Sequence, residues 1–300
     1  FVKPVLDNGE KVCLLVVDCM RHDHFRSIQP LLEPFFNIEI NHKFSLLPTA
    51  TPYSRNAIFS GLLPSDIIKK YPKQGQDIRE NAPSLNQYED QFLKDQLKNM
   101  NLNNKSIYYH KIWAVEEGLK FQNRIKDYIQ IDMLALVVNF VDILAHKSSQ
   151  MDVLKEMVPD ESGYRAAVKS WLKNSWLLQV LKQLSDHNYT VILTSDHGSI
   201  RVQRDVMVAA DRDASSGVRY KVGRNLNTKN KNGLLITDPD EYKLPAFGAQ
   251  PTYLIAKDDA YFIYPNQAHR YQAKFKNSFQ HGGISMEEIM VPVAIMKSRV

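Results

Sequence analysis

The sequence predicts an α/β fold in which a mostly parallel central sheet is covered by helices on both faces, with inserted cap elements. Uninterrupted apolar runs, which are typical of strands buried on both sides, alternate with segments of helical periodicity. The expected strands lie at 11–19, 36–48 and 105–113, in the apolar centre of 128–146, at the start of 190–200 and in 282–296. Because parallel strands need crossover connections, this alternation favours a doubly covered sheet.

Four segments have the pattern of helices that would cover this sheet. They are 24–36, 51–62, 84–100 and 162–184. The second has a clear start, since Thr51 is a suitable cap for a helix whose first residue is Pro52. Two long stretches, about 62–130 and about 199–280, interrupt the alternation, and we expect them to be inserted segments that form a cap or bind substrate.

Composition restricts the class of protein. Of 300 residues, 44% are hydrophobic and 24% are charged, which excludes a disordered or fibrous chain. No apolar run approaches the roughly 18 residues of a membrane span, and the net charge of +5 favours an anionic partner. Cys13 and Cys19 would lie about 20 Å apart along an extended strand, too far for a disulfide, which favours a cytoplasmic location.

Metal-competent residues stand where the expected strands end. They are Asp18, Thr51, Asp142, His146, Asp196 and His197, with His281 just before the last strand. In α/β sheets of this kind, ligands bind beyond the carboxyl ends of the strands. If the sheet is parallel, we expect all of them at the same edge, and three carboxylates, three imidazoles and one hydroxyl there would suit two zinc-like ions.

Each of these residues also has an ordinary structural explanation. Asp142 and His146 are four residues apart, as in a surface pair on a helix, and the pair Asp196 and His197 could occupy a turn. Asp18 could cap the helix that follows it. Their joint occurrence at successive strand ends favours a metal centre, which the geometry must test.

The ordered series of motifs resembles a known superfamily. "PTATP" around Thr51, then "DILAH", "SDHG" and "HGG", are similar to motifs of the alkaline phosphatase superfamily. Within it, "DCMRHD" and "DASSGVRYKVGRNL" resemble the PglZ domain, in particular the effector half of PorX-type response regulators. The resemblance implies that 1–300 is one alkaline phosphatase-like PglZ domain, preceded in the natural protein by a receiver domain.

The same resemblance implies two zinc ions as cofactors, with other divalent metals as alternatives. One ion would be held by Asp142, His146 and His281, and the other by Asp18, Asp196, His197 and Thr51. It further implies a cytoplasmic two-component regulator whose partner is a protein of the type IX secretion machinery or a sigma factor.

Thr51 would be the nucleophile. A metal lowers the pKa of a hydroxyl, and the positive end of the following helix favours the alkoxide. Thr49, two residues earlier, is the alternative. Arg55 matches the Arg that sulfatases place four residues after their nucleophile, where it would contact the transferred group bidentately. The alternative for Arg55 is an exposed residue in the first turn of the helix. By the same resemblance, Asn56 would supply a contact to the oxyanion.

Two basic stretches with aromatic neighbours indicate the class of substrate. They carry Arg219, Lys221, Arg224 and Lys274. Cations beside aromatic rings suit a phosphate backbone and stacked bases. A basic hairpin that faces solvent has the same composition, so both interpretations stay open.

The sequence therefore predicts a zinc-dependent phosphodiesterase or phosphatase that acts on nucleotides or oligonucleotides through a phosphothreonine intermediate, as the effector domain of a two-component response regulator. The alternative is a metal-stabilised output domain that mainly binds a protein partner. The length and cyclisation of the substrate, the metal, the trigger and the oligomeric state, including a homodimer, stay open.

Overall fold

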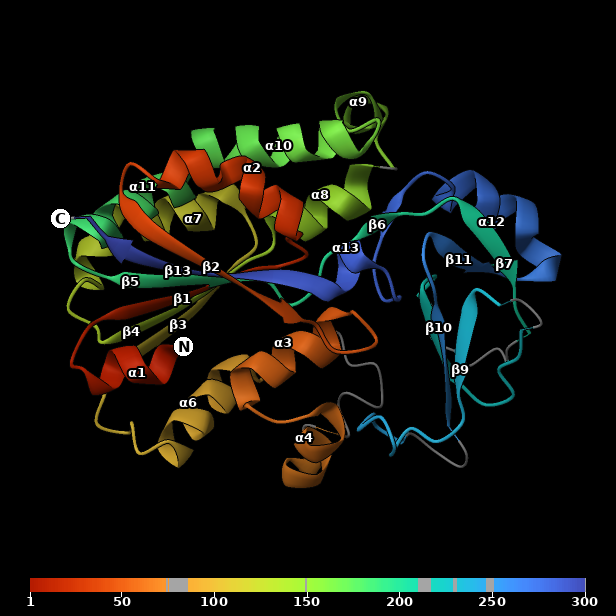
Figure 1. Ribbon diagram of the computed structural model, residues 1–300, viewed down its shortest axis with the longest axis horizontal. Coiled ribbons are helices and arrows are strands. Elements are labelled where there is room, and N and C mark those ends of the chain that lie inside the picture. The colour runs from red at the N-terminus through yellow and green to blue at the C-terminus, as the bar shows by residue number, and fades with distance from the viewer. Residues whose placement is uncertain are drawn as a thin grey trace.

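Six strands form the central sheet of the computed structural model, in the order β2-β13-β5-β1-β4-β3 (Figure 1). They are β1 (Val12–Val17), β2 (Phe36–Phe44), β3 (Ile107–Ile112), β4 (Met133–Val138), β5 (Thr190–Thr194) and β13 (Met290–Ser298). The structure describes residues 1–73, 75, 86–148, 150–209, 217–228, 231–246 and 251–299.

Five of the six strands run in the same direction. β1 pairs in parallel with β4 and β5, and β3 pairs in parallel with β4, whereas β13 is antiparallel to both β5 and β2. The predicted α/β fold is confirmed, with one reversed strand. Because β13 is reversed, the residues that precede it lie at the same edge as the carboxyl ends of the parallel strands.

Helices cover both faces of the sheet (Figure 1). One face carries α2 (His22–Leu32), α7 (Val115–Asn123), the 3-10 turn η1 (Ile125–Asp127), α8 (Phe140–Ser148), α9 (Asp152–Met157), α10 (Glu161–Asn174) and α11 (Trp176–Asp186). The other face carries α1 (Val2–Asp7), α3 (Thr51–Ser60), α4 (Pro64–Lys70) and α6 (Glu89–Asn99). None of the helices in the described part of the chain has the length and apolar character needed to cross a membrane.

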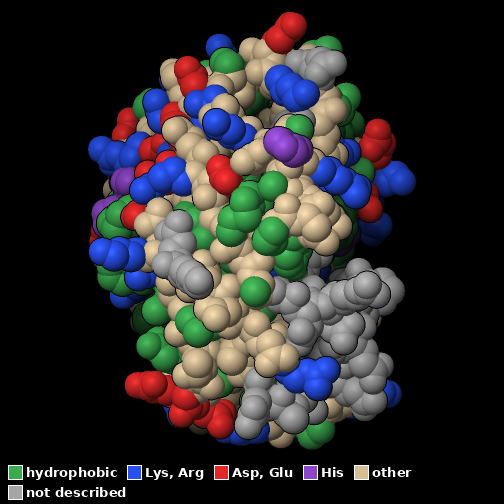
Figure 2. Space-filling view, turned by 90° about the vertical axis from the view of Figure 1, so that its right-hand side faces the viewer, with side chains coloured by type: hydrophobic (Ala, Val, Ile, Leu, Met, Phe, Trp, Pro, Cys, Tyr) green, Lys and Arg blue, Asp and Glu red, His purple; other side chains and the backbone are tan. Residues whose placement is uncertain are grey.

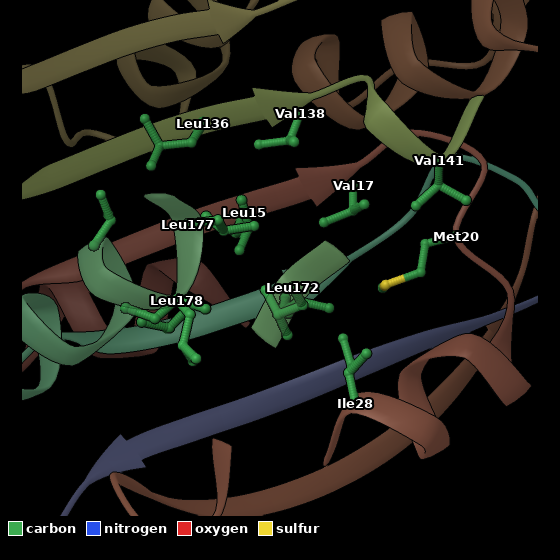
Figure 3. Close-up of a cluster of buried hydrophobic side chains, with 14 of the residues drawn as sticks. Leu15, Val17, Met20, Ile28, Leu136, Val138, Val141, Leu172, Leu177 and Leu178 are labelled. Atoms are coloured by element: carbon green, nitrogen blue, oxygen red, sulfur yellow. The ribbon is translucent and has the colours of Figure 1, made fainter. Parts of the chain in front are cut away.

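Alternate residues of each central strand face opposite helical layers, which explains why these strands are apolar throughout. In β1, Leu15 and Val17 pack in one cluster with Leu172 of α10 (Figure 3). Leu14 of the same strand packs on the other side with Phe59 of α3. Full burial of one such side chain contributes roughly 1.5–3 kcal/mol, so both layers hold the sheet in place.

Two helix boundaries differ from the prediction. The helix expected at 162–184 is divided at Ser175, whose backbone is extended (φ −95°, ψ 159°) and whose hydroxyl donates to the Leu172 carbonyl. α3 begins at Thr51, with Ala50 in the extended cap position. Thr51 is therefore the first helical residue and not the cap, and its hydroxyl lies 3.0 Å from an imidazole of the candidate site.

The two interrupting stretches fold in different ways. The first, at about 62–130, supplies helices and also β3, which is an edge strand of the central sheet. The second, at about 199–280, forms a smaller lobe at the end of the sheet where the parallel strands terminate (Figure 1). Its elements are β6 (Ile200–Arg201), β7 (Arg204–Met207), β8 (Tyr220–Gly223), β9 (Gly233–Ile236), β10 (Thr252–Ala256), β11 (Ala260–Ile263), η2 (Pro265–Gln267), α12 (Ala268–Phe275) and β12 (Phe279–Gln280). A short helix, α13 (Met286–Ile289), then leads into β13.

Leu136→Ala is expected to lower the free energy of unfolding by about 2–5 kcal/mol, because it removes buried methyl groups from β4 and leaves a cavity. Chemical denaturation followed by circular dichroism measures the change. Leu235→Ala in β9 is the control, since that residue is 40% exposed and should lose less than about 0.5 kcal/mol. Equal losses in the two variants would contradict the placement of Leu136 in the core.

Candidate metal centre

Three predicted ligands from two adjacent strands form the first group. Asp18 follows β1, and Asp196 and His197 follow β5, the neighbour of β1 in the sheet. One ligand atom of each residue lies within 4.8 Å of the other two. His197 Nε2 is 3.8 Å from both Asp18 Oδ1 and Asp196 Oδ2. All three side chains are buried.

The second group combines α8 with the segment before β13. Asp142 and His146 lie one turn apart on α8, which begins shortly after β4. His146 Nε2 is 3.3 Å from Asp142 Oδ1 and 3.2 Å from His281 Nε2. His281 Nε2 is 3.6 Å from Asp142 Oδ1. This group reaches the surface, because His146 is exposed.

The two groups are neighbours at the edge of the sheet where the parallel strands end. The imidazole rings of His197 and His281 stack with their centroids 4.3 Å apart, so one ring of each group lies at the boundary between them. The structure therefore brings together all six Asp and His residues that the strand ends indicated as ligands.

Three carboxylate oxygens of these groups have no hydrogen-bond partner among the described residues. They are Asp18 Oδ1, Asp142 Oδ1 and Asp196 Oδ2, and all three are buried. Burial of a polar oxygen without a partner costs free energy, which a cation at that position would offset. Tetrahedral zinc holds N and O ligands at about 2.0–2.2 Å and therefore about 3.3–3.6 Å apart. The separations of 3.2–3.6 Å in the second group fit this geometry.

The electrostatics of the site also favours cations. Burial, followed by the charge of Asp196, raises the pKa of Asp18 well above its usual value. Burial raises the pKa of Asp196 as well, although Arg55 opposes this shift. Burial and the neighbouring His197 lower the pKa of His281 to about 3. His281 is therefore neutral at physiological pH, and neutral imidazole is the form that binds metal.

Backbone carbonyls determine which nitrogen of two imidazoles carries the proton. His197 Nδ1 lies 3.0 Å from the Gly198 carbonyl oxygen, and His281 Nδ1 lies 3.2 Å from the Thr49 carbonyl oxygen. Because a carbonyl oxygen only accepts, each neutral ring donates from Nδ1 and presents an unprotonated Nε2 to the ligand groups.

The two candidate nucleophiles have different surroundings. The Thr51 hydroxyl, at the start of α3, lies 3.0 Å from His197 Nε2 beside the first group. The Thr49 hydroxyl is buried, donates to the Gly283 carbonyl at 2.8 Å and accepts from the Gly282 amide at 3.1 Å. The hydroxyl of Thr49 thus anchors the loop before α13, whereas that of Thr51 faces a ligand of the site.

Arg55 lies behind the first group. Its buried guanidinium donates to Asp18 Oδ2 and Glu89 Oε1, both at 2.5 Å, and to Asn139 Oδ1 at 3.2 Å. The expected bidentate contact with a transferred group does not match this arrangement, because Nε and Nη1 already bond within the protein. Arg55 instead holds one oxygen of Asp18 and leaves the other to face His197.

Several supporting residues were not found from the sequence. The buried Glu89 carboxylate accepts from Tyr109 and pairs with Lys111 at 3.0 Å. The Cys19 amide, in the left-handed backbone region (φ 64°), donates to Asp196 Oδ1 at 3.2 Å, and Oδ2 of the same carboxylate has no hydrogen-bond partner in the described part of the chain. Asn139 could have been noticed as the polar residue that directly follows a buried strand in "VVNFVD". Glu89 has no such local signal, because it lies on a helix of the first interrupting stretch.

Asn56 supports the turn that carries the candidate nucleophile. It is buried on α3, donates to the Pro52 carbonyl at 2.9 Å and accepts from Asn86 Nδ2 at 3.1 Å. Asn86 Nδ2 is also 3.3 Å from the Thr51 carbonyl oxygen. These contacts tie the first turn of α3 to the segment before α6, and the expected contact of Asn56 to an oxyanion stays untested.

The family model of the BREX system PglZ alkaline phosphatase-like domain matches residues 1–296. The chain belongs to this PglZ family. The family predicted from the motifs is therefore confirmed, and the expected enzyme class, a phosphoric ester hydrolase, agrees with membership of an alkaline phosphatase-like family.

Solved ectonucleotide pyrophosphatase/phosphodiesterases have the same fold as this PglZ domain. The murine and human forms of member 5 align with 95% of the chain at 14% identity and a TM-score of 0.61, over 88% and 87% of their own chains. An inactive murine form in complex with AMP aligns with 95% of the chain and 87% of its own, at 14% identity and a TM-score of 0.55. No curated protein sequence is a match.

The basic residues expected to bind substrate divide into buried and exposed ones. Arg219 and Lys221 are buried in the smaller lobe, with Lys221 Nζ 4.8 Å from the ring centroid of Tyr264. The guanidinium of Arg219 is enclosed in an internal ion pair and does not reach the surface. Arg224 and Lys274 are exposed. Figure 2 shows the end of the smaller lobe, where basic and acidic side chains are interspersed.

We expect the zinc-loaded PglZ domain to hold about two ions per chain. His281→Ala should remove the ion of the second group and Asp18→Asn that of the first, because each group is left with two of its three Asp and His ligands. Elemental analysis after gel filtration measures the content. His269→Ala, at an exposed histidine of α12, is the matched control and should keep both ions. Wild-type protein without transition metal after metal-replete purification would contradict the site.

Proposed function

We propose that this PglZ domain is a zinc-dependent phosphodiesterase that acts on nucleotides, with Thr51 as the nucleophile. The observation that carries the proposal is the position of the Thr51 hydroxyl, 3.0 Å from a candidate metal ligand and beside buried carboxylate oxygens that have no partner among the described residues. Ala50 occupies the cap position of α3 and Thr51 is the first helical residue, so this hydroxyl is not the cap of the helix.

Bound zinc ions would neutralise the phosphate and lower the pKa of the attacking hydroxyl. The chain itself supplies orientation. The amino end of α3 carries a partial positive charge that favours an oxyanion at Thr51. Thr51 Oγ1 forms a bond to phosphorus, the bond to the leaving alcohol breaks, and the alcohol takes up a proton. Water then hydrolyses the phosphothreonine ester, releases a nucleoside monophosphate and restores the hydroxyl.

The nucleotide class of substrate is supported by two features. The net charge of +5 favours an anionic substrate. Among the proteins with the same fold, ectonucleotide pyrophosphatase/phosphodiesterases carry that activity in their name, and one was solved with AMP. The oligonucleotide alternative depends on the exposed cations Arg224 and Lys274.

The second candidate function is a metal-stabilised output domain that mainly binds a protein partner. The regulatory setting stays a prediction from resemblance, and so do the receiver domain, the type IX secretion or sigma-factor partner and the homodimer. A cytoplasmic location is supported by the two free cysteines. A hydrolysis screen of phosphomonoesters against phosphodiesters separates the two functions, because the output domain would hold metal without turnover.

Thr51→Val keeps the shape of the side chain but removes the attacking oxygen. We expect turnover of a phosphodiester to fall by at least about a thousandfold, on the order of 4 kcal/mol in the barrier. Thr51→Ser is the control and should keep most of the activity, because it retains the hydroxyl. Steady-state kinetics on an aryl phosphodiester measures both. Activity of Thr51→Val within tenfold of wild type would rule out Thr51 as the nucleophile.

Thr49→Val should lower the activity by weakening metal binding and not by removing a reacting group. Its hydroxyl bonds to Gly282 and Gly283, next to His281, so its loss should weaken metal binding by the second group. Excess zinc should therefore restore part of the activity of Thr49→Val and none of that of Thr51→Val. If zinc rescues neither variant, Thr49 belongs to the reacting groups.

The double variant Arg224→Gln/Lys274→Gln tests the oligonucleotide alternative. If both cations contact phosphates, oligonucleotide binding should weaken and the slope of its salt dependence should decrease by about 1 per lost contact, with hydrolysis of a small aryl phosphodiester unchanged. Lys94→Gln/Lys98→Gln, at exposed cations of α6, is the control. An unchanged salt dependence would restrict the substrate to short nucleotides.

A further inference from the structure

The loop that carries His281 is held in place by the smaller lobe. The Ile284 amide donates to the Ala256 carbonyl at 2.7 Å, and the Asp258 amide donates to the Ile284 carbonyl at 2.8 Å. From the side of α3, the Thr49 hydroxyl bonds to the same loop. The third ligand of the second group therefore depends on contacts from outside the central sheet.

A buried ion pair lies against this loop. Arg219, just before β8, donates from Nε to Glu288 Oε1 at 3.0 Å, from Nη2 to Glu288 Oε2 at 2.5 Å and from Nη1 to the Ala260 carbonyl. Glu288 of α13 also accepts from the Gly283 amide at 2.8 Å. Neither side chain of the pair is exposed. The pair joins the smaller lobe, the loop and the start of β13.

The two glycines after His281 make this close approach possible. A side chain at position 283 would overlap the Arg219 guanidinium and the Ala256 carbonyl. A side chain at position 282, where φ is +112°, would be strained and would also overlap Tyr220. The "HGG" motif is thus explained by contact with the smaller lobe.

We propose that Arg219 and Glu288 are positioning residues that hold His281 in the geometry of the second metal site. This inference rests on the proposed metal-dependent function, but it concerns metal affinity and not hydrolysis. Groups that orient metal ligands typically contribute about 10–100-fold in affinity. Since Arg219 belongs to the smaller lobe, that lobe is a structural part of the metal centre, in addition to any contact it makes with substrate.

Arg219→Lys tests the proposal, because it keeps the positive charge but loses the planar fork that bonds both oxygens of Glu288. Zinc affinity of the second site should fall about 10–100-fold, measured by titration against a chromophoric chelator. An Asp18→Asn background removes the first site, so that the remaining zinc reports on the second. Arg204→Gln, which breaks an exposed ion pair with Asp259 in the same lobe, is the control and should not change zinc binding.

A second variant separates positioning from folding. Arg219→Met/Glu288→Met replaces the pair with apolar side chains, a change that often leaves stability unchanged or improves it. The Gly283 amide nevertheless loses its acceptor. We therefore expect a melting temperature near that of wild type together with weakened zinc binding at the second site. A stable double variant with wild-type affinity would overturn the proposal.

The site of action is checked in a His281→Ala background. There Arg219→Lys should cause no further loss of zinc, because the loop no longer carries a ligand to position. A folded Arg219→Lys protein that keeps wild-type affinity, or one that loses both sites equally, would overturn the proposal. Wild-type protein that binds two zinc ions without hydrolysing any phosphoester would contradict the proposed function alone, since the effect of Arg219 on zinc affinity is measured without turnover.

Discussion

The arrangement of the site depends on the cost of burying three carboxylates at one edge of a sheet. Asp18, Asp142 and Asp196 each keep one buried oxygen without a hydrogen-bond partner among the described residues. Such oxygens are unfavourable in a low-dielectric interior unless a cation faces them. Because the apolar strands place these carboxylates in the interior, the site needs positive charge nearby. The adjacent imidazoles favour cations that also bind nitrogen. Zinc-like ions suit this mixture of oxygen and nitrogen ligands.

Two buried arginines lie near the two groups, one bonded to a candidate ligand and the other to a residue that holds the loop of His281. Arg55 joins Asp18 of the first group to Glu89, whereas Glu288 joins Arg219 to the loop before β13. In each case a guanidinium that could have served a phosphate is used to hold protein groups. Removal of one partner from a buried pair typically costs about 3–5 kcal/mol, so these contacts make the ligand geometry rigid.

The alternation of apolar and amphipathic segments was sufficient to predict the α/β fold, and position near a strand end was sufficient to select the six candidate ligands that the structure brings together. Both are local properties, because burial on two faces and the end of a strand are visible in short windows of sequence. The roles of Arg55 and Arg219 were not visible. Their partners lie 34 and 69 residues away, and a basic residue looks the same in sequence whether it faces solvent or a buried carboxylate.

The sequence by itself determined which side chains are available for metal and roughly where the central strands lie, although the strand expected in 282–296 runs from Met290 to Ser298 and follows a short helix. Only the tertiary structure decided that the last strand, β13, runs against its neighbours. If β13 were parallel, the residues before it would lie at the opposite edge of the sheet, and His281 would be remote from Asp142 and His146. Strand direction depends on how the smaller lobe returns the chain to the sheet. That path includes long-range contacts such as the pair of Arg219 and Glu288, which no local pattern encodes.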